Sequence, residues 1–270
     1  MRLMLVCKPD RKKILTLTGL FLAAGLLLLL FTSPKLPASE EAIYTLSSDS
    51  DVFVEEKIAY LTFDDGPSSI TGGLLDILKQ KQVAATFFVV GEGNDISTDE
   101  RDILWKRMAD EGHLIGLHVW EHCDYHQIYA SAESYLSSLG RLEDEIDQVT
   151  GREPRVYRFP AGSNNAYCSL DEYRAITDEM TAEGYIYVDW NVDGQDAIGI
   201  NRTADAVASH VIREAKKQVT PVILLHDIPS CKGSVQAVSR IIDALWAAGY
   251  RFDTLDHLKV EVHQNIKGLK

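Results

Sequence analysis

The chain has 270 residues, of which 46% are hydrophobic, 25% charged and 9% aromatic, a balance typical of a globular protein with a full core. Its net charge of −13 argues against a general nucleic-acid binder, because such proteins need a basic surface to displace counterions. The four cysteines have no C-x-x-C spacing, which excludes a zinc ribbon or a thioredoxin-like redox motif, and they are too few for a small disulfide-stabilised domain.

The N-terminal region has the pattern of a membrane-targeting segment. Residues 1–13 carry a net charge of +4, and the 18 residues 14–31 are uncharged and mostly apolar. As a helix, residues 14–31 would span about 27 Å, close to the thickness of a bilayer core. The basic flank predicts a cytoplasmic N-terminus and a single-pass anchor in the cell membrane, with the rest of the chain extracellular. A cleaved signal peptide and a secreted protein are the alternative, but the long apolar run and the poor cleavage site at residues 36–38 favour the anchor.

Residues 32–56 are polar and contain prolines, so we interpret them as an extracellular stalk. From residue 57 to residue 260, short apolar runs alternate with amphipathic stretches, which predicts β-α units around a parallel sheet. The seven predicted strands are residues 58–63, 85–90, 114–118, 156–159, 185–190, 222–226 and 251–255.

Helix signals fall between these strands. Ser97 with Glu100 and Ser169 with Glu172 have the spacing of helix capping boxes. Seven β-α units in about 200 residues predict a single α/β domain, a barrel one unit short of the eightfold form, followed by a tail at residues 261–270.

Reactive side chains collect at the predicted C-terminal ends of the strands. Asp64 and Asp65 follow the first strand, and His118 ends the third strand with His122 just beyond it. The same position on three further strands is held by Arg158, Asp189 and His226. In parallel α/β barrels this rim is where active sites form, so we expect these residues to share one site.

Asp65, His118 and His122 offer one carboxylate and two imidazoles, a set that can hold Zn²⁺ and leave one position open for water. A chance pair of histidines on a loop is the alternative, because H-x-x-x-H is a common spacing; the strand-end carboxylates favour the metal site. The Asp64-Asp65 pair before Gly-Pro could be only a turn, but such a turn could also aim one carboxylate at a metal and leave the other free to accept a proton. His126 continues the four-residue interval and is interpreted as a surface residue.

Five short motifs occur in order along the predicted barrel. They are T-F-D-D-G-P at 62–67, G-x-H-x-x-x-H at 116–122, R-F-P-A-G at 158–162, D-W-N at 189–191 and I-L-L-H-D at 223–227. Together they resemble the motifs of the polysaccharide deacetylases, the NodB-like domain of carbohydrate esterase family four, and in particular the peptidoglycan N-acetylglucosamine deacetylases. The resemblance covers residues 57–260 and implies a distorted (β/α)7 barrel, which agrees with the seven predicted strands.

The resemblance also implies a role for each matching side chain. Asp65, His118 and His122 would hold one divalent cation, Zn²⁺ before Co²⁺ or Ni²⁺. Asp64 would be the catalytic base, held in place by a neighbouring arginine, Arg158.

Four further residues complete the implied site. His226 would be the general acid, with Asp189 as its orienting partner. The backbone N–H of Ala161 would help to stabilise an oxyanion, and Trp190 and Leu224 would line a pocket for the acetyl methyl group.

The sequence departs from the family pattern at three positions. Val119 stands where the family has Ser or Thr, so a hydroxyl that steadies the metal loop is missing, and packing of Trp120 could replace it. Ala161 replaces a more usual Gly or Tyr, which matters little for a backbone donor. Cys123 beside His122 has no assigned role; binding the metal or pairing with another cysteine remain alternatives.

The resemblance implies metal-assisted hydrolysis of N-acetyl groups on an amino-sugar polymer. Because the domain is expected outside a membrane anchor, N-acetylglucosamine of peptidoglycan is the leading substrate, before chitin-like oligomers or a surface poly-N-acetylglucosamine. An O-acetyl xylan esterase using the same site and a non-catalytic wall-binding domain are the alternatives. The expected partners are therefore the acetylated polymer and, through residues 14–31, the membrane, whereas nucleic acid is excluded and the oligomeric state is left open.

Overall fold

The computed structural model describes residues 56–92, 95–122, 124–198 and 202–266. The predicted anchor at 14–31, its basic flank at 1–13 and nearly all of the predicted stalk lie outside these residues. Within the described ranges, no helix is long and apolar enough to cross a membrane.

Parallel strands form one sheet whose order is β5-β4-β3-β2-β1-β7-β6, with β8 pairing to the start of β1. In the described chain no ladder joins β5 to β6, so the sheet is an incomplete barrel. The strands are β1 (Ile58–Asp64), β2 (Thr86–Val90), β3 (Leu114–Val119), β4 (Val156–Tyr157), β5 (Ile186–Tyr187), β6 (Val192–Asp193), β7 (Val222–His226) and β8 (Arg251–Phe252). The predicted parallel α/β architecture is confirmed.

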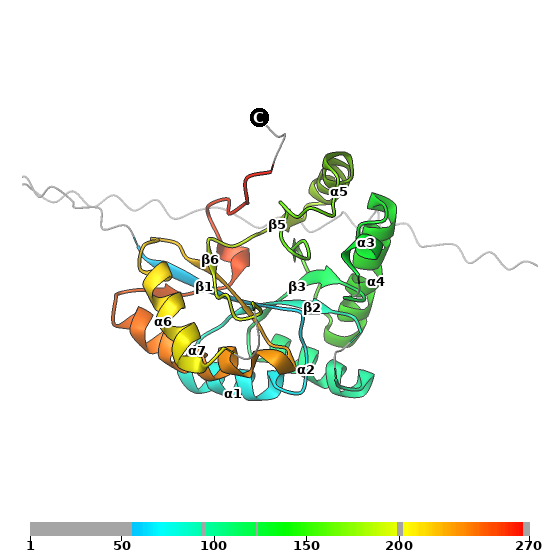
Figure 1. Cartoon of the computed structure of the whole chain (residues 1–270). Helices are drawn as coiled ribbons and strands as arrows, with labels where there is room; N and C mark the ends of the chain where they lie inside the picture. Colours follow the sequence, from blue (N-terminus) through cyan, green and yellow to red (C-terminus); the bar gives the residue numbers. More distant parts are fainter. Residues whose placement is uncertain (1–55, 93–94, 123, 199–201, 267–270) are drawn as a thin grey trace, which may run out of the picture. The chain divides into compact units, whose positions relative to one another are not determined.

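The helices form a layer along the strands, in which neighbours contact one another in the order α6, α7, α1, α2, α4, α5 (Figure 1). Two of them, α2 and α5, begin at the predicted capping boxes, where Ser97 and Ser169 accept from the N–H three residues later. The helices are α1 (Thr71–Lys81), α2 (Thr98–Asp110), α3 (Tyr125–Ile128), α4 (Ala132–Thr150), α5 (Leu170–Ala182), α6 (Ala204–Ala215) and α7 (Lys232–Trp246), with 3-10 turns at Pro229–Cys231 and Leu255–His257.

Alternate side chains of the strands enter two separate apolar clusters. In β1, Leu61 and Phe63 belong to the large cluster that also contains the buried faces of the helices. Tyr60 points the other way and joins Phe88 and Val222 in a smaller cluster. The period-two alternation of a strand therefore fills both faces of the sheet, which explains why β1 is apolar on both faces.

Three predicted strands are shorter in the structure. The expected strand at 156–159 is shortened to β4, which ends at Tyr157. The expected strand at 185–190 is shortened to β5, because the backbone changes partners after it: the N–H of Val188 donates to β4, that of Asp189 to Val262 and that of Asn191 to Val222. β6, which begins at Val192, was not expected. The expected strand at 251–255 is shortened to β8 and continues into a 3-10 turn.

The C-terminal segment lies against the stretch of chain between β5 and β6. The N–H of Asp189 donates to the carbonyl of Val262, and the N–H of Gln264 donates to the Asp189 carboxylate. The ring of His263 stacks on Tyr187 with 3.9 Å between centroids. Residues 262–264, expected to belong to a tail, are thus packed onto the sheet.

Candidate active site

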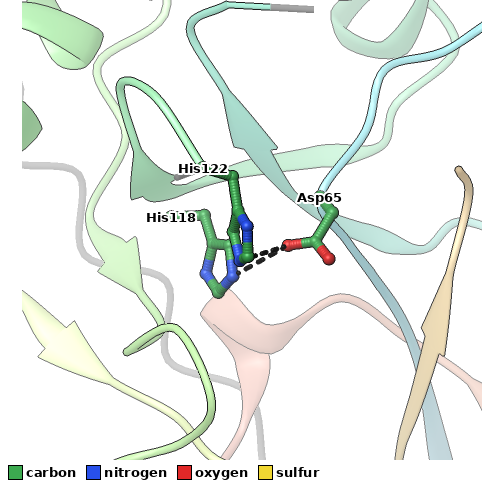
Figure 2. A group of neighbouring side chains, drawn as sticks. All are labelled: Asp65, His118 and His122. Carbon is green, nitrogen blue, oxygen red and sulfur yellow. Dashed lines mark ion pairs between the residues drawn. The ribbon is translucent and has the colours of Figure 1, made fainter. Parts of the chain in front are cut away.

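Asp65, His118 and His122 point toward one another (Figure 2). Asp65 follows β1, whereas His118 lies in β3 and His122 in the loop after it. The Oδ1 atom of Asp65 is 3.2 Å from Nε2 of His118 and 3.4 Å from Nε2 of His122. These spacings fit a tetrahedral divalent cation, because ligand atoms about 2.0–2.2 Å from one Zn²⁺ lie roughly 3.3 Å apart. The expected ligand set is therefore assembled by the fold.

The surroundings of the two histidines leave both Nε2 atoms available. Nδ1 of the buried His118 lies 2.8 Å from the carbonyl oxygen of Arg158, which can only accept, so Nδ1 donates and Nε2 is the nitrogen that faces Asp65. Burial lowers the pKa of His122, which favours the neutral imidazole that a metal requires. The two rings stack with 5.8 Å between centroids.

The turn after β1 directs two adjacent carboxylates to different partners. Asp65 has a φ of 70°, in the left-handed region that Asp tolerates better than most residues. As a result Asp65 faces the histidines, whereas Asp64 stays in register with β7 opposite His226 and bonds to Arg158. The backbone conformation thus separates the two carboxylates as expected, with Asp65 toward the histidines and Asp64 toward Arg158.

Arg158 is fully buried and fixes Asp64. One Nη atom donates to Oδ1 of Asp64 at 2.8 Å and to Oγ1 of Thr62 at 2.7 Å. Its Nε and second Nη donate to the backbone carbonyls of Val188 and Asp189. With its donors occupied, the guanidinium holds the Asp64 carboxylate in one place at the rim.

His226 is paired with Asp196, a residue that the sequence analysis missed. Nδ1 of His226 lies 2.9 Å from Oδ1 of Asp196, and Oδ2 of Asp196 accepts from the backbone N–H of His226 and from Oγ of Ser234. Burial alone would lower the pKa of His226, but the hydrogen bond and charge of Asp196, with Asp65 and Asp64 nearby, outweigh it and raise the pKa to about 10. His226 is thus held as a proton donor whose Nε2 lies 4.0 Å from Asp65 Oδ2.

The expected pairing of Asp189 with His226 is wrong. The Asp189 carboxylate accepts from the backbone N–H and the hydroxyl of Ser163 and from the N–H of Gln264. Asp196 was missed because it follows β6, which has a single buried residue, Val192, and no apolar run to reveal it. Had β6 been recognised, the rule that reactive side chains follow strand ends would have drawn attention to the two acids there, Asp193 and Asp196.

A cavity of about 160 Å³ joins these groups to the expected substrate-binding residues. Ala161, Trp190 and Leu224 line it together with the metal-ligand candidates. Ala161 has a φ of 63° in the turn after Arg158, and its neighbour Gly162 has a φ of 82°. A Cβ atom on Gly162 would lie 2.9 Å from the Trp190 ring, so a glycine is required there for the turn to lie against Trp190.

Val119 has no hydroxyl to steady the loop that carries His122, and contacts of Trp120 hold this loop instead. The N–H of Trp120 donates to Oγ of Ser138 at 2.8 Å, and its Nε1 donates to Glu92. The Arg141 guanidinium lies over the Trp120 ring at 3.7 Å. The packing of Trp120 that the sequence suggested is therefore present.

Two of the cysteines can be placed. Cys168 is half-buried, Cys231 is buried, and both are free thiols. Burial raises the pKa of each to about 12, so neither is a ready nucleophile. Cys123 lies outside the described residues.

The sequence matches the polysaccharide deacetylase family over residues 52–178. It is 34% identical to a peptidoglycan-N-acetylglucosamine deacetylase of Bacillus cereus over 203 residues. This match covers 74% of this chain and 69% of the relative. The peptidoglycan-N-acetylmuramic acid deacetylase PdaA of Bacillus subtilis is 28% identical over 239 residues, with 86% of this chain and 84% of the relative covered.

A solved structure shares the fold as well. The catalytic domain of a peptidoglycan N-acetylglucosamine deacetylase from Eubacterium rectale matches with a TM-score of 0.71 and 34% identity, over 78% of this chain and 94% of that chain. Sequence and fold therefore lead to the same assignment that the five motifs suggested: this chain belongs to the polysaccharide deacetylase family.

Proposed function

We propose that the protein is a metal-dependent N-deacetylase that acts on N-acetylglucosamine residues of peptidoglycan. One observation carries the proposal: a ligand set of Asp65, His118 and His122 shares one cavity with two proton-transfer groups, each fixed by a buried partner. Arg158 holds Asp64, and Asp196 holds His226. A wall-binding domain without activity would have no need of this arrangement.

A divalent cation at this ligand set, Zn²⁺ before Co²⁺ or Ni²⁺, would polarise the amide carbonyl and make water more acidic. Asp64 takes a proton from the attacking water, whose oxygen bonds to the carbonyl carbon. The backbone N–H of Ala161 donates to the oxyanion that develops. His226 then gives its proton to the amide nitrogen as the carbon–nitrogen bond breaks, and the products are acetate and a free amine on the sugar.

Two relatives favour different sugars of the same polymer. The Bacillus cereus relative is named for N-acetylglucosamine and PdaA for N-acetylmuramic acid. The identity is higher to the former, and the solved structure from Eubacterium rectale carries the same N-acetylglucosamine name. N-acetylglucosamine is therefore our first candidate, and N-acetylmuramic acid is the second.

The location that we propose is the outer face of the cell membrane. The basic residues 1–13 and the apolar run 14–31 support a single-pass anchor that would place the deacetylase domain beside the wall. N-terminal sequencing of the protein made in cells tests this location. An N-terminus that follows the apolar run would mean that the segment is a cleaved signal peptide and that the protein is released.

The test is acetate release by the full-length chain in detergent micelles. The panel contains intact peptidoglycan, N-acetylglucosamine oligomers and acetylated xylan, each assayed before and after chelation and again after Zn²⁺ is restored. The proposal expects chelator-sensitive acetate release from the amino-sugar polymers. Acetate release from acetylated xylan alone would mean that the protein is an O-acetyl esterase and not an N-deacetylase. Unchanged activity after complete metal removal would refute the metal dependence.

A further inference from the structure

A second group of metal-binding side chains lies beside the first. Asp196, His226 and Cys231 each offer one ligand atom, and these three atoms lie within 4.8 Å of one another. Asp196 and His226 line the same cavity as the expected metal ligands, whereas Cys231 ends the 3-10 turn that follows β7. Asp196 and Cys231 are buried, unlike the acidic groups that commonly gather on a protein surface. We call Asp196, His226 and Cys231 the thiol cluster.

The hydrogen bonds of Asp196 leave one of its oxygens able to change partner. Oδ2 accepts from the N–H of His226 and from Oγ of Ser234, and both bonds are independent of Oδ1. Oδ1 lies 2.9 Å from Nδ1 of His226. Ligand atoms of one tetrahedral cation lie roughly 3.5 Å apart, so this gap has to widen by only about half an ångström to admit an ion.

The thiol of Cys231 is held by weak contacts. Its Sγ atom lies 3.7 Å from the carbonyl oxygen of Asp196 and 3.8 Å from the hydroxyl of Ser230. A thiol is a poor hydrogen-bond donor, so these contacts oppose a small movement of Sγ only slightly. A shift of about 1 Å toward His226 would complete a set of one thiolate, one imidazole and one carboxylate.

The charges around the thiol cluster favour a cation. Asp196, Asp65 and Asp64 outweigh the effect of burial and raise the pKa of His226 to about 10, and the same negative charges attract a metal ion. Burial raises the pKa of Cys231 to about 12, so the thiolate forms only when a cation compensates its charge. Thiolate sulfur prefers soft cations, whereas Asp65, His118 and His122 offer only oxygen and nitrogen.

We propose that the thiol cluster is a second, inhibitory cation site, which takes a soft divalent ion such as Cd²⁺ or excess Zn²⁺. The cation bonds to Sγ of Cys231, Nδ1 of His226 and Oδ1 of Asp196, and the thiol proton and the Nδ1 proton leave to solvent. The remaining imidazole is neutral and gives up its Nε2 proton less readily than an imidazolium, so the proton donor is disabled. Because two protons must be displaced, the site fills only when the cation is in excess.

Cadmium binding to the full-length chain in detergent micelles, first loaded with one equivalent of Zn²⁺, tests the site. We expect one Cd²⁺ to bind with the zinc retained, and to give the ultraviolet absorption of a cadmium–thiolate bond. Cys231→Ser should lose this absorption and bind the Cd²⁺ at least about 10–100-fold more weakly, since the loss of even an outer partner of a metal ligand costs that much. Without cadmium its acetate release should be unchanged, because Cys231 does not line the cavity.

The other three cysteines supply the matched controls. Cys7→Ser, Cys123→Ser and Cys168→Ser should each keep the cadmium–thiolate absorption. His226→Gln removes a different member of the thiol cluster, and it should lose the Cd²⁺ and retain the zinc. Absorption that persists in Cys231→Ser or in His226→Gln, or that is lost in a control variant instead, would overturn the proposal.

Inhibition of acetate release completes the test, and this part rests on the proposed function. Excess Cd²⁺ should lower kcat of the wild-type chain, and Cys231→Ser should need at least about tenfold more Cd²⁺ for the same loss. Equal inhibition of the two chains would refute the inhibitory site alone. A wild-type chain that releases no acetate from any amino-sugar polymer would refute the proposed function, and the absorption of bound Cd²⁺ would still decide whether the second site exists.

Discussion

Asp196 holds His226 at two points, since its Oδ1 atom lies 2.9 Å from Nδ1 of the imidazole and its Oδ2 atom accepts from the backbone N–H of the same residue. Side chain and main chain of the proton donor are thus both tied to one carboxylate. Because Asp196 is itself buried and also accepts from Ser234, the pair has little freedom to rotate.

The pairing predicts the pH dependence of the reaction. Asp196 raises the pKa of His226 toward about 10, so the imidazolium persists through neutral pH and is lost only as the pH rises through that value. In Asp196→Asn the pKa of His226 should fall, and the alkaline limb of the kcat profile should move to lower pH. Asp189→Asn is the matched control, because its carboxylate bonds to Ser163 and Gln264 instead. A limb that moves in Asp189→Asn and not in Asp196→Asn would contradict this assignment.

Metal content should separate the ligand candidates from the base. His118→Ala and His122→Ala should lose most of the bound cation, since each removes one of three convergent ligand atoms. Asp64→Asn should retain the cation and lose activity by about 100-fold or more, the usual scale for a general base. The readout is elemental analysis of the purified chain alongside acetate release. Equal metal content in all three variants would mean that His118 and His122 are not ligands.

Arg158 should contribute to stability as well as to catalysis. It is fully buried and donates to the Asp64 carboxylate, the Thr62 hydroxyl and two backbone carbonyls. Arg158→Met leaves that carboxylate buried and unpaired, and we expect a loss of roughly 3–5 kcal/mol in the free energy of unfolding. Arg155→Met is the control, since its ion pair with Glu153 is exposed to solvent and should contribute little to stability. Urea denaturation measures both, and similar losses for the two variants would disprove the structural role of Arg158.

Gly162 should not tolerate a side chain. Its φ of 82° and the 2.9 Å approach of a Cβ atom to Trp190 both disfavour alanine, so Gly162→Ala should destabilise the fold by about 1–3 kcal/mol and raise KM by displacing Trp190. Gly140→Ala in α4 meets nothing within 4 Å and should stabilise the helix by about 0.5–1 kcal/mol. Thermal unfolding of the two variants checks the opposite signs, and a shift in the same direction would count against the argument.

The strand-end rule explains why much of the site was predictable from sequence. β1, β3 and β7 are seven, six and five residues long and mostly apolar, so their ends, and with them Asp65, His118 and His226, could be located. β6 has two residues, and its existence depends on pairing with β7, a contact between distant parts of the chain that periodicity does not report. Asp196 was therefore missed and Asp189, at the end of a more visible apolar run, was chosen in its place.

The contact between the rings of Tyr125 and Tyr167, whose centroids lie 4.9 Å apart, was also not predictable from the sequence. The two residues lie on different segments, and no spacing rule connects α3 with the loop before α5. His126 could be placed at the surface because its neighbourhood is polar, but its proximity to Tyr167 required the structure.

The anchoring of Asp189 has a consequence for the order in which the molecule is assembled. The turn that carries Ala161 is fastened through Ser163 to Asp189, and Asp189 receives its last hydrogen bond from Gln264, 75 residues further along the chain. The segment of Gln264 contains no helix or strand, so we expect it to join the sheet, and this turn to become rigid, only after the central strands have paired. A substitution at Val262 or a chain break before Gln264 would then leave the sheet folded but the turn that carries Ala161 mobile. Activity would therefore be lost under conditions in which the sheet is still folded.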